Sequence, residues 1–126
     1  MDLDKVQYFE DPWFCGSETF YVTTAVRNLV ATEGIKTMFD KLKCYWIGDH
    51  VMSYLHDIKS KVDVYGNFFV VRVIVSEDKS ASFVVDDGNE NLVISRRVDF
   101  TDLSQNVRFY LTFDSFRWTM LLPTEY

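Results

Sequence analysis

The chain has 126 residues, of which 48% are hydrophobic and 25% charged, a composition typical of one globular domain with a single core. Nineteen acidic residues against thirteen Lys and Arg give a formal net charge of -6, which argues against direct binding to nucleic acid or to an anionic membrane. We therefore expect residues 1–126 to form one acidic domain that folds alone and binds neither nucleic acid nor a membrane.

The N-terminal stretch Met1–Glu10 is polar and acidic, unlike a signal peptide. The longest apolar runs are far shorter than the roughly 20 residues of a membrane-spanning helix. Cys15 and Cys44 each lie beside an aromatic residue, where a thiol behaves as a small buried hydrophobic group. These features predict a cytoplasmic protein in which both thiols stay reduced.

Residues 1–31 are expected to be an extended N-terminal segment, and residues 32–61 follow a helical period. Thr32 is a plausible N-cap, with Glu33 favourable in the first turn of the first helix. The apolar stripe of this helix consists of Ile35, Met38, Phe39 and Leu42, and that of a second helix consists of Ile47, Val51, Tyr54 or Leu55, and Ile58. Both stripes have the spacing of amphipathic helices that pack on a core.

From residue 67 the period of apolar residues changes from 3.6 to 2, which indicates strands. Five runs fall at residues 69–75, 81–85, 92–100, 107–113 and 116–122, with turn signals between them. The alternation predicts an antiparallel meander over 67–122 with one packed and one solvated face. Since the two helices are the available cover, the predicted fold is α+β, with two amphipathic helices on one face of a roughly five-stranded antiparallel meander sheet.

The sequence contains none of the short nucleophile-elbow, phosphate-loop, dinucleotide or zinc-protease motifs. The best catalytic candidate is Asp49, Ser53 and His56, which share one face of the second helix and could hold a metal or transfer a proton. A third protein ligand is not obvious, and His50 points elsewhere. The same residues are typical of a solvated helix face, so we expect no metal and no cofactor.

Acidic side chains gather in the predicted turns. Asp86–Glu90 superficially resembles a calcium loop, but its Gly comes too early, and the segment is typical of a hairpin turn. Successive turns of a meander alternate between the ends of a sheet, so these carboxylates cannot all form one patch. A net charge of this size is ordinary for a small soluble domain. The sharper alternative is that one acidic end docks on a basic, nucleic-acid-binding surface of a partner protein. The candidate partner-binding residues are Glu77, Asp78, Asp86, Asp87, Asn89 and Glu90.

Five segments together resemble a family of small proteins of unknown function found in bacterial genomes, plasmids and phages. They are FCGSETFY (14–21), TEGIKTMFDKLKCYWIGD (32–49), DDGN (86–89), FTDL (100–103) and WTMLLPTEY (118–126). The chain departs from the family pattern at Glu33, Gly48, Arg72, Ser104 and Thr124. The main family-motif positions are Glu18, Tyr21, Trp46, Asp49, Gly88 and Glu125.

The resemblance implies a phage or mobile-element context, in which short acidic proteins often occlude a host protein. On this basis we predict a non-enzymatic inhibitor or adaptor in the cytoplasm of a bacterial host. Its partner would be an immune effector such as a CRISPR nuclease complex, which would make it an anti-CRISPR protein. Two alternatives stay open: a small metal-dependent hydrolase using Asp49, Ser53 and His56, and a self-associating module or homodimer whose last strand, residues 116–122, is an exposed sheet edge.

Overall fold

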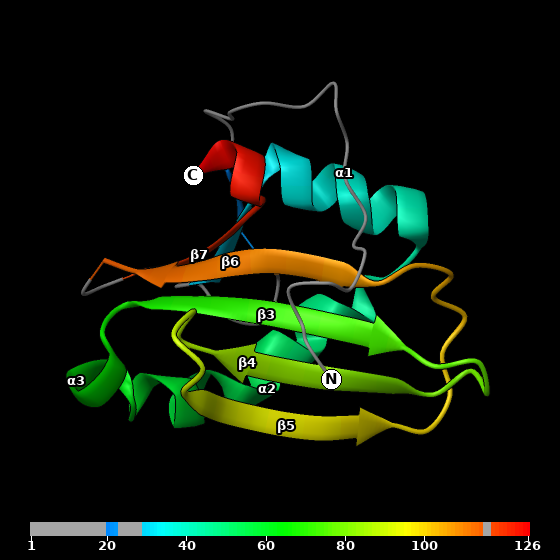
Figure 1. Ribbon diagram of the computed structural model, residues 1–126. Coiled ribbons are helices and arrows are strands. Elements are labelled where there is room, and N and C mark those ends of the chain that lie inside the picture. Colours follow the sequence, from blue (N-terminus) through cyan, green and yellow to red (C-terminus); the bar gives the residue numbers. More distant parts are fainter. Residues whose placement is uncertain (1–19, 23–28, 115–116) are drawn as a thin grey trace.

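The computed structural model describes residues 20–22, 29–114 and 117–126. Cys15, Glu18 and Phe116 lie outside the described residues. The strands are β1 (Phe20–Val22), β2 (Leu29–Thr32), β3 (Phe68–Val75), β4 (Ala81–Asp86), β5 (Leu92–Val98), β6 (Val107–Phe113) and β7 (Trp118–Leu121). The helices are α1 (Glu33–Leu42), α2 (Trp46–Lys59), the single-turn α3 (Val62–Tyr65) and the 3₁₀ turn η2 (Pro123–Glu125). Figure 1 shows their arrangement.

The fold is α+β, as predicted, but its sheet is larger than the expected five-stranded meander. Seven strands lie in the order β1-β2-β7-β6-β3-β4-β5. β2 and β7 pair in parallel, and every other pair is antiparallel. The two additional strands, β1 and β2, come from residues 20–32, at the end of the segment expected to be merely extended. The sheet is therefore mixed.

The order of the later strands also corrects the predicted meander. β3, β4 and β5 follow one another, but β6 returns to lie beside β3, which is a Greek-key arrangement. The connection 99–106 runs along one end of the sheet to reach β6 (Figure 1). Residues 69–74 of β3 are buried at every position, as expected for a central strand that needs neighbours on both sides. A meander would have left this strand at an edge.

The last strand is not a sheet edge, so the proposed self-association through residues 116–122 is wrong in that form. β7 pairs with β2 on one side and with β6 on the other, which occupies the backbone groups that a second copy would need. In the sheet as described, the outer strands are β1 and β5. The short β2 covers the side of β7 that the predicted meander left open. β2 comes from residues 29–32, in the segment that was expected to be extended.

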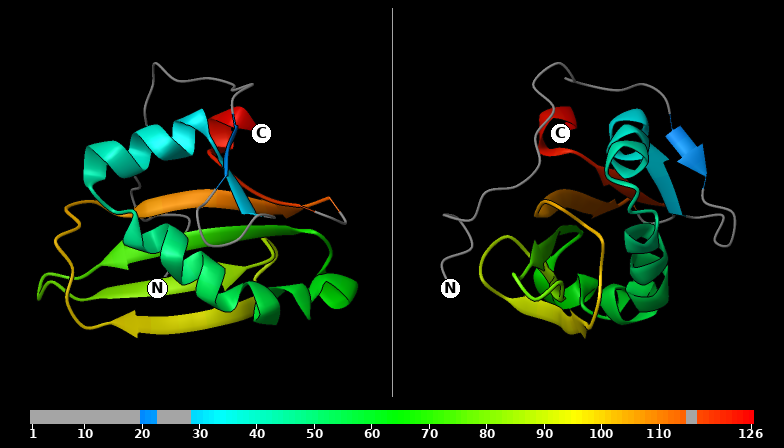
Figure 2. Two further views of the ribbon diagram at one scale, coloured as in Figure 1. Left: turned by 180° about the vertical axis from the view of Figure 1, so that it is seen from behind. Right: turned by 90° about the vertical axis from the view of Figure 1, so that its right-hand side faces the viewer.

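Both helices cover the same face of the sheet, as predicted. Phe39 of α1 packs edge-on against Phe109, and Tyr54 of α2 packs against Phe83. Phe109 and Phe83 face the same side because they pair with Val71 and Val73, two residues apart on β3. α1 lies beside β1, β2 and β7, whereas α2 crosses β3 to β5, in front of the sheet in the left view of Figure 2. One continuous hydrophobic cluster joins the two helices to the sheet.

The C-terminal turn is attached to the start of α1 through Glu125. Its carboxylate accepts a hydrogen bond from the hydroxyl of the N-cap residue Thr32 at 2.5 Å and from the Gly34 amide at 3.3 Å. It also accepts from the Leu122 amide at 2.9 Å. Thr32 in turn accepts from the Ile35 amide, so the predicted cap is confirmed. A carboxylate at this position compensates the unpaired amides and the positive end of the helix dipole.

Replacing Glu125 with Ala is therefore expected to lower the free energy of unfolding by about 2 kcal/mol, since charge-assisted hydrogen bonds to the helix start are lost. Urea titration followed by circular dichroism measures this change. Thr124→Ala, at the exposed neighbouring position, is the control and should have no measurable effect. Equal stability of the two variants would contradict a role for Glu125 in attaching the C-terminus.

The second face of the sheet is not simply solvated, contrary to the expectation from the alternating pattern. Val70, Arg72 and Ile74 on this side of β3 are all at most 8% exposed. The Arg72 guanidinium forms an ion pair with the buried carboxylate of Asp86 on β4. A buried charge requires such a partner, which explains how an arginine is accommodated in the central strand.

Candidate functional site

The helix-face candidates Asp49, Ser53 and His56 lie on the exposed side of α2. The Ser53 hydroxyl donates to the backbone carbonyl of Asp49, not to its carboxylate. Among the described residues, His, Cys, Asp and Glu form no group of three that could hold a metal ion. These three side chains therefore have the arrangement of a solvated helix face, with Asp49 in the first turn where the helix dipole favours a carboxylate.

The Asp86–Glu90 hairpin uses its first two carboxylates internally. Asp86 accepts from the Gly88 amide in addition to its ion pair. Asp87, which is buried, accepts from the Asn89 and Asn91 amides and from the Asn91 side chain. The hydrogen bond from the Asn91 side chain is the main reason that the pKa of Asp87 lies below its ordinary value of 3.8. Both aspartates thus stabilise the predicted turn. Of the four candidate partner-binding residues in this loop, Asn89 and Glu90 are exposed, whereas Asp86 and Asp87 are buried.

Gly88 has a positive φ of 82°, which a glycine adopts without strain. A Cβ added at this position would lie 3.6 Å from the ring of Phe68. Phe68 also packs edge-on against Tyr110 and Tyr126. Gly88, Glu125 and Tyr126 therefore have structural roles at the end of the sheet opposite the β3–β4 hairpin.

The β3–β4 hairpin lies at the other end of the sheet, next to the β5–β6 connection. The Thr101 amide donates to the Lys79 carbonyl at 2.8 Å. Arg97 lies 3.7 Å from the Asp78 carboxylate and 3.3 Å from that of Asp99. Hydrogen bonds from Ser80 hold the pKa of Asp78 below its ordinary value. The exposed carboxylates at this end, which we call the acidic end, are Glu77, Asp78, Asp99 and Asp102.

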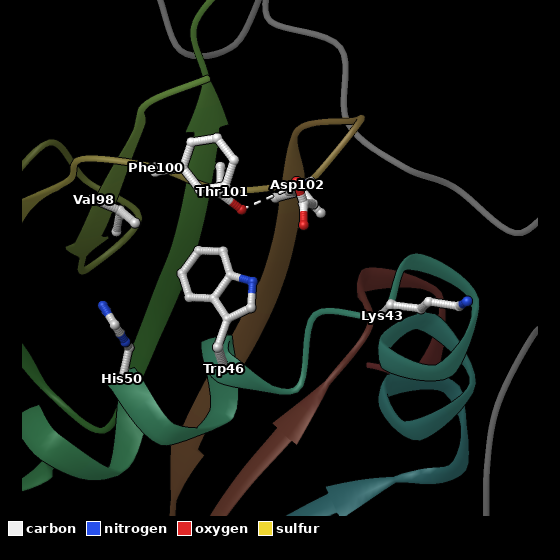
Figure 3. Close-up of a pocket in the computed structure, with 8 residues that line it drawn as sticks. Lys43, Trp46, His50, Val98, Phe100, Thr101 and Asp102 are labelled. Atoms are coloured by element: carbon white, nitrogen blue, oxygen red, sulfur yellow. Dashed lines mark hydrogen bonds between the residues drawn. The ribbon is translucent and has the colours of Figure 1, made fainter. Parts of the chain in front are cut away.

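A pocket of about 340 Å³ opens between the start of α2 and the β5–β6 connection (Figure 3). The Trp46 indole points towards the connection, and the side chain of Lys43 extends away from it (Figure 3). The Thr101 hydroxyl accepts from the Leu103 amide and holds the connection in place. The lining residues are Lys43, Trp46, His50, Val98, Phe100, Thr101, Asp102 and Leu103.

Phe100 was expected to lie in a strand, since the third predicted run covered residues 92–100. It is instead a loop residue that lines the pocket, and it is 67% exposed. β5 ends at Val98, so the period-two pattern no longer applies two residues later. The position of Phe100 between Asp99 and Asp102 was the available signal, because solvated residues around an aromatic favour a loop.

His50 forms one wall of the pocket and is surrounded by aromatic rings. Its ring centroid lies 5.2 Å from that of Trp46 and 5.4 Å from that of Phe83, both in edge-on geometry. Trp46 itself is only half-buried. These ring contacts hold the His50 and Trp46 side chains on the helix side of the pocket.

Cys44 is the middle residue of the connection 43–45 between α1 and α2, and it is fully buried. Burial raises the pKa of its thiol to about 12, so the reactive thiolate is suppressed. Cys44 therefore packs as a small hydrophobic residue, as expected, and is unsuited to nucleophilic catalysis.

The chain belongs to a family of unknown function (DUF6876), whose model matches residues 12–126. The match confirms that the chain is a member of a family without an assigned function. No curated protein and no solved structure matches the chain. Within the described residues, each helix is too short or too polar to cross a lipid bilayer.

Proposed function

We propose that this protein is a non-enzymatic binding module, an inhibitor or adaptor that contacts a partner protein through its acidic end. The observation that carries the proposal is Phe100, a largely exposed aromatic beside a pocket and between exposed carboxylates. Large aromatic residues at the centre of an interface supply much of the binding free energy. An exposed phenylalanine in this setting is therefore better explained by contact with a partner than by packing within the domain.

The charges around Phe100 indicate which kind of surface it meets. Asp99 and Asp102 flank it in the chain, and Glu77 and Asp78 lie on the adjacent hairpin. Within the described part of the chain, Asp102 forms no ion pair. Carboxylates at the rim of an interface accelerate association with a basic surface and make it sensitive to salt. A basic partner is thus favoured over an acidic or neutral one.

The partner class to test first is a nucleic-acid-binding immune effector of a bacterial host, such as a CRISPR nuclease complex. Such a protein has a basic surface for its guide or target, and an acidic module in the same cytoplasm would block that surface by occupying it. In this proposal the surface differs in part from the one expected from sequence. The proposed surface keeps Glu77 and Asp78 of the β3–β4 hairpin. It leaves out the Asp86–Glu90 hairpin and adds the β5–β6 connection.

The test is affinity capture from host-cell lysate with the tagged protein, read by mass spectrometry at low salt and at 0.5 M salt. The wild-type protein is compared with Phe100→Ala and with Leu92→Ala, a similarly exposed apolar control at the other end of β5. We expect one basic partner that is retained at low salt and lost at high salt. Capture of this partner should fall about tenfold or more in Phe100→Ala and stay unchanged in Leu92→Ala.

Two results would overturn the proposal. The first is a partner captured equally by wild type and Phe100→Ala, which would place the interface elsewhere. The second is a catalytic activity of the purified protein that disappears in Asp49→Asn or His56→Ala, which would favour the hydrolase alternative.

A further inference from the structure

We propose that the pocket beside Phe100 receives one arginine side chain of the partner, an inference that rests on the proposed function. The inference follows from the size of the pocket, from the chemistry of its lining and from the charge at its rim. Each of these excludes a different class of occupant.

The size of the pocket suits a single long side chain. Its volume of about 340 Å³ is at the lower end of the range of roughly 300–1,000 Å³ typical of small-molecule sites. The pocket lies directly beside the exposed Phe100, so an anchor residue of a partner that contacts Phe100 would be within reach of it. The volume is therefore small for a bulky cofactor and large enough for one long side chain, and the position of Phe100 favours a side chain from a docked partner.

The lining combines aromatic walls with a carboxylate. Trp46 presents its indole to the opening, Phe100 lies across from it on the connection, and Asp102 is on the same connection (Figure 3). A cation over an indole face is attracted by the ring quadrupole, and Trp is the strongest of the aromatic residues in this respect. A carboxylate beside two aromatic rings therefore favours a positively charged, planar group over a neutral or an anionic one.

Lys43 is the one Lys or Arg of the lining, and it does not oppose this assignment. Its side chain extends away from Trp46 (Figure 3). The molecule also contains an internal example of the proposed contact, since the guanidinium of Arg96 lies 5.4 Å from the ring centroid of Tyr54, one turn beyond His50 on α2.

Arginine fits this pocket better than lysine. Its guanidinium is planar and weakly hydrated, so it can stack on Trp46 while donating two parallel hydrogen bonds to the Asp102 carboxylate. A lysine ammonium is a strongly hydrated point charge that would lose more solvation and could not stack in the same way. The carboxylates of the acidic end would also draw an arginine-bearing surface towards the opening.

The test is a titration of the full-length ¹⁵N-labelled protein with N-acetyl-arginine amide, followed by NMR at the indole N–H of Trp46. The signal is assigned with Trp46→Phe. The isosteric neutral N-acetyl-citrulline amide and N-acetyl-lysine amide are the comparison probes. We expect a saturable shift with the arginine probe in the millimolar range, a several-fold weaker response to lysine and none to citrulline.

Asp102→Asn should weaken binding of the arginine probe about tenfold, because the charge-assisted pair is lost. Asp63→Asn, at an exposed carboxylate on α3, is the matched control and should bind as the wild type does. Equal shifts with arginine and citrulline, or wild-type binding by Asp102→Asn, would overturn the arginine assignment. So would the absence of any shift in the folded wild-type protein.

The two proposals fail separately. If lysate capture depends on Phe100 while the arginine probe fails, the protein-binding function stands and the arginine assignment is wrong. If the arginine probe binds but capture does not depend on Phe100, the pocket recognises the guanidinium group and the proposed interface is wrong.

Discussion

Phe109→Asp is expected to abolish folding. Phe109 is fully buried on β6, between β3 and β7, and its ring packs against Phe39 of α1. The substitution removes a large apolar side chain, which alone costs about 3–5 kcal/mol, and leaves a carboxylate unpaired in the core. Because the total stability of a small domain is about 5–15 kcal/mol, the variant should lose its near-ultraviolet circular dichroism and its cooperative thermal transition.

Arg108→Asp is the matched control, since it places the same carboxylate one residue earlier on the opposite side of β6. Arg108 is half-buried and pairs in register with Arg72, so a new carboxylate there would face a cation. This variant should remain folded with a cooperative transition. Equal effects of the two substitutions would contradict the register of β6, because a shift of one residue exchanges the two faces.

Arg72→Met is expected to lower the free energy of unfolding by about 3 kcal/mol. The substitution introduces an unbranched apolar side chain into the central strand but leaves the Asp86 carboxylate buried without its cation. Breaking one partner of a buried ion pair costs about 3–5 kcal/mol, whereas replacing both partners is often nearly neutral. Chemical denaturation of the purified variant measures this loss.

The double variant Arg72→Met with Asp86→Asn separates the unpaired charge from the lost packing. The amide oxygen of the introduced asparagine would still accept the hydrogen bond that the Gly88 amide now donates to Asp86. We expect the double variant to be more stable than Arg72→Met by about 1 kcal/mol or more. A double variant less stable than the single one would show that the cost does not come from an unpaired carboxylate.

The helices α1 and α2 and the strands β3 to β7 were predictable because their signals are local. The Thr32 cap and the stripe of Ile35, Met38 and Phe39 specify α1, and all four positions behave as the pattern predicts. The alternation in residues 107–113 likewise identifies the packed face of β6. These features depend on neighbours within a few residues, which the sequence shows directly.

The strand order was not predictable from the same patterns. The return of β6 to β3 depends on which strand must be buried on both faces, and the run from Phe68 to Val75 is the only indication of it. Arg72 weakened that indication, because its partner Asp86 is 14 residues away in the chain and appeared to belong to an exposed turn. Pairing between distant residues carries no periodic signal.

The candidate site was only partly predictable, because its parts come from segments that are distant in the chain. Glu77 and Asp78 are exposed in a hairpin, as their turn sequence suggested. The proximity of this hairpin to Asp99 and Phe100 follows from the Thr101–Lys79 contact, which the Greek-key connection creates. Asp86 and Asp87 have a similar local sequence, but their carboxylates are turned inward by Arg72 and Asn91.

The most direct test of the proposed interface is hydrogen–deuterium exchange of the protein with and without its captured partner. We predict that the partner slows exchange in residues 76–80 and 98–103, around the acidic end and the pocket, and leaves residues 87–91 unchanged. Protection confined to the Asp86–Glu90 hairpin or to the exposed face of α2 would contradict the assignment of the acidic end as the binding surface.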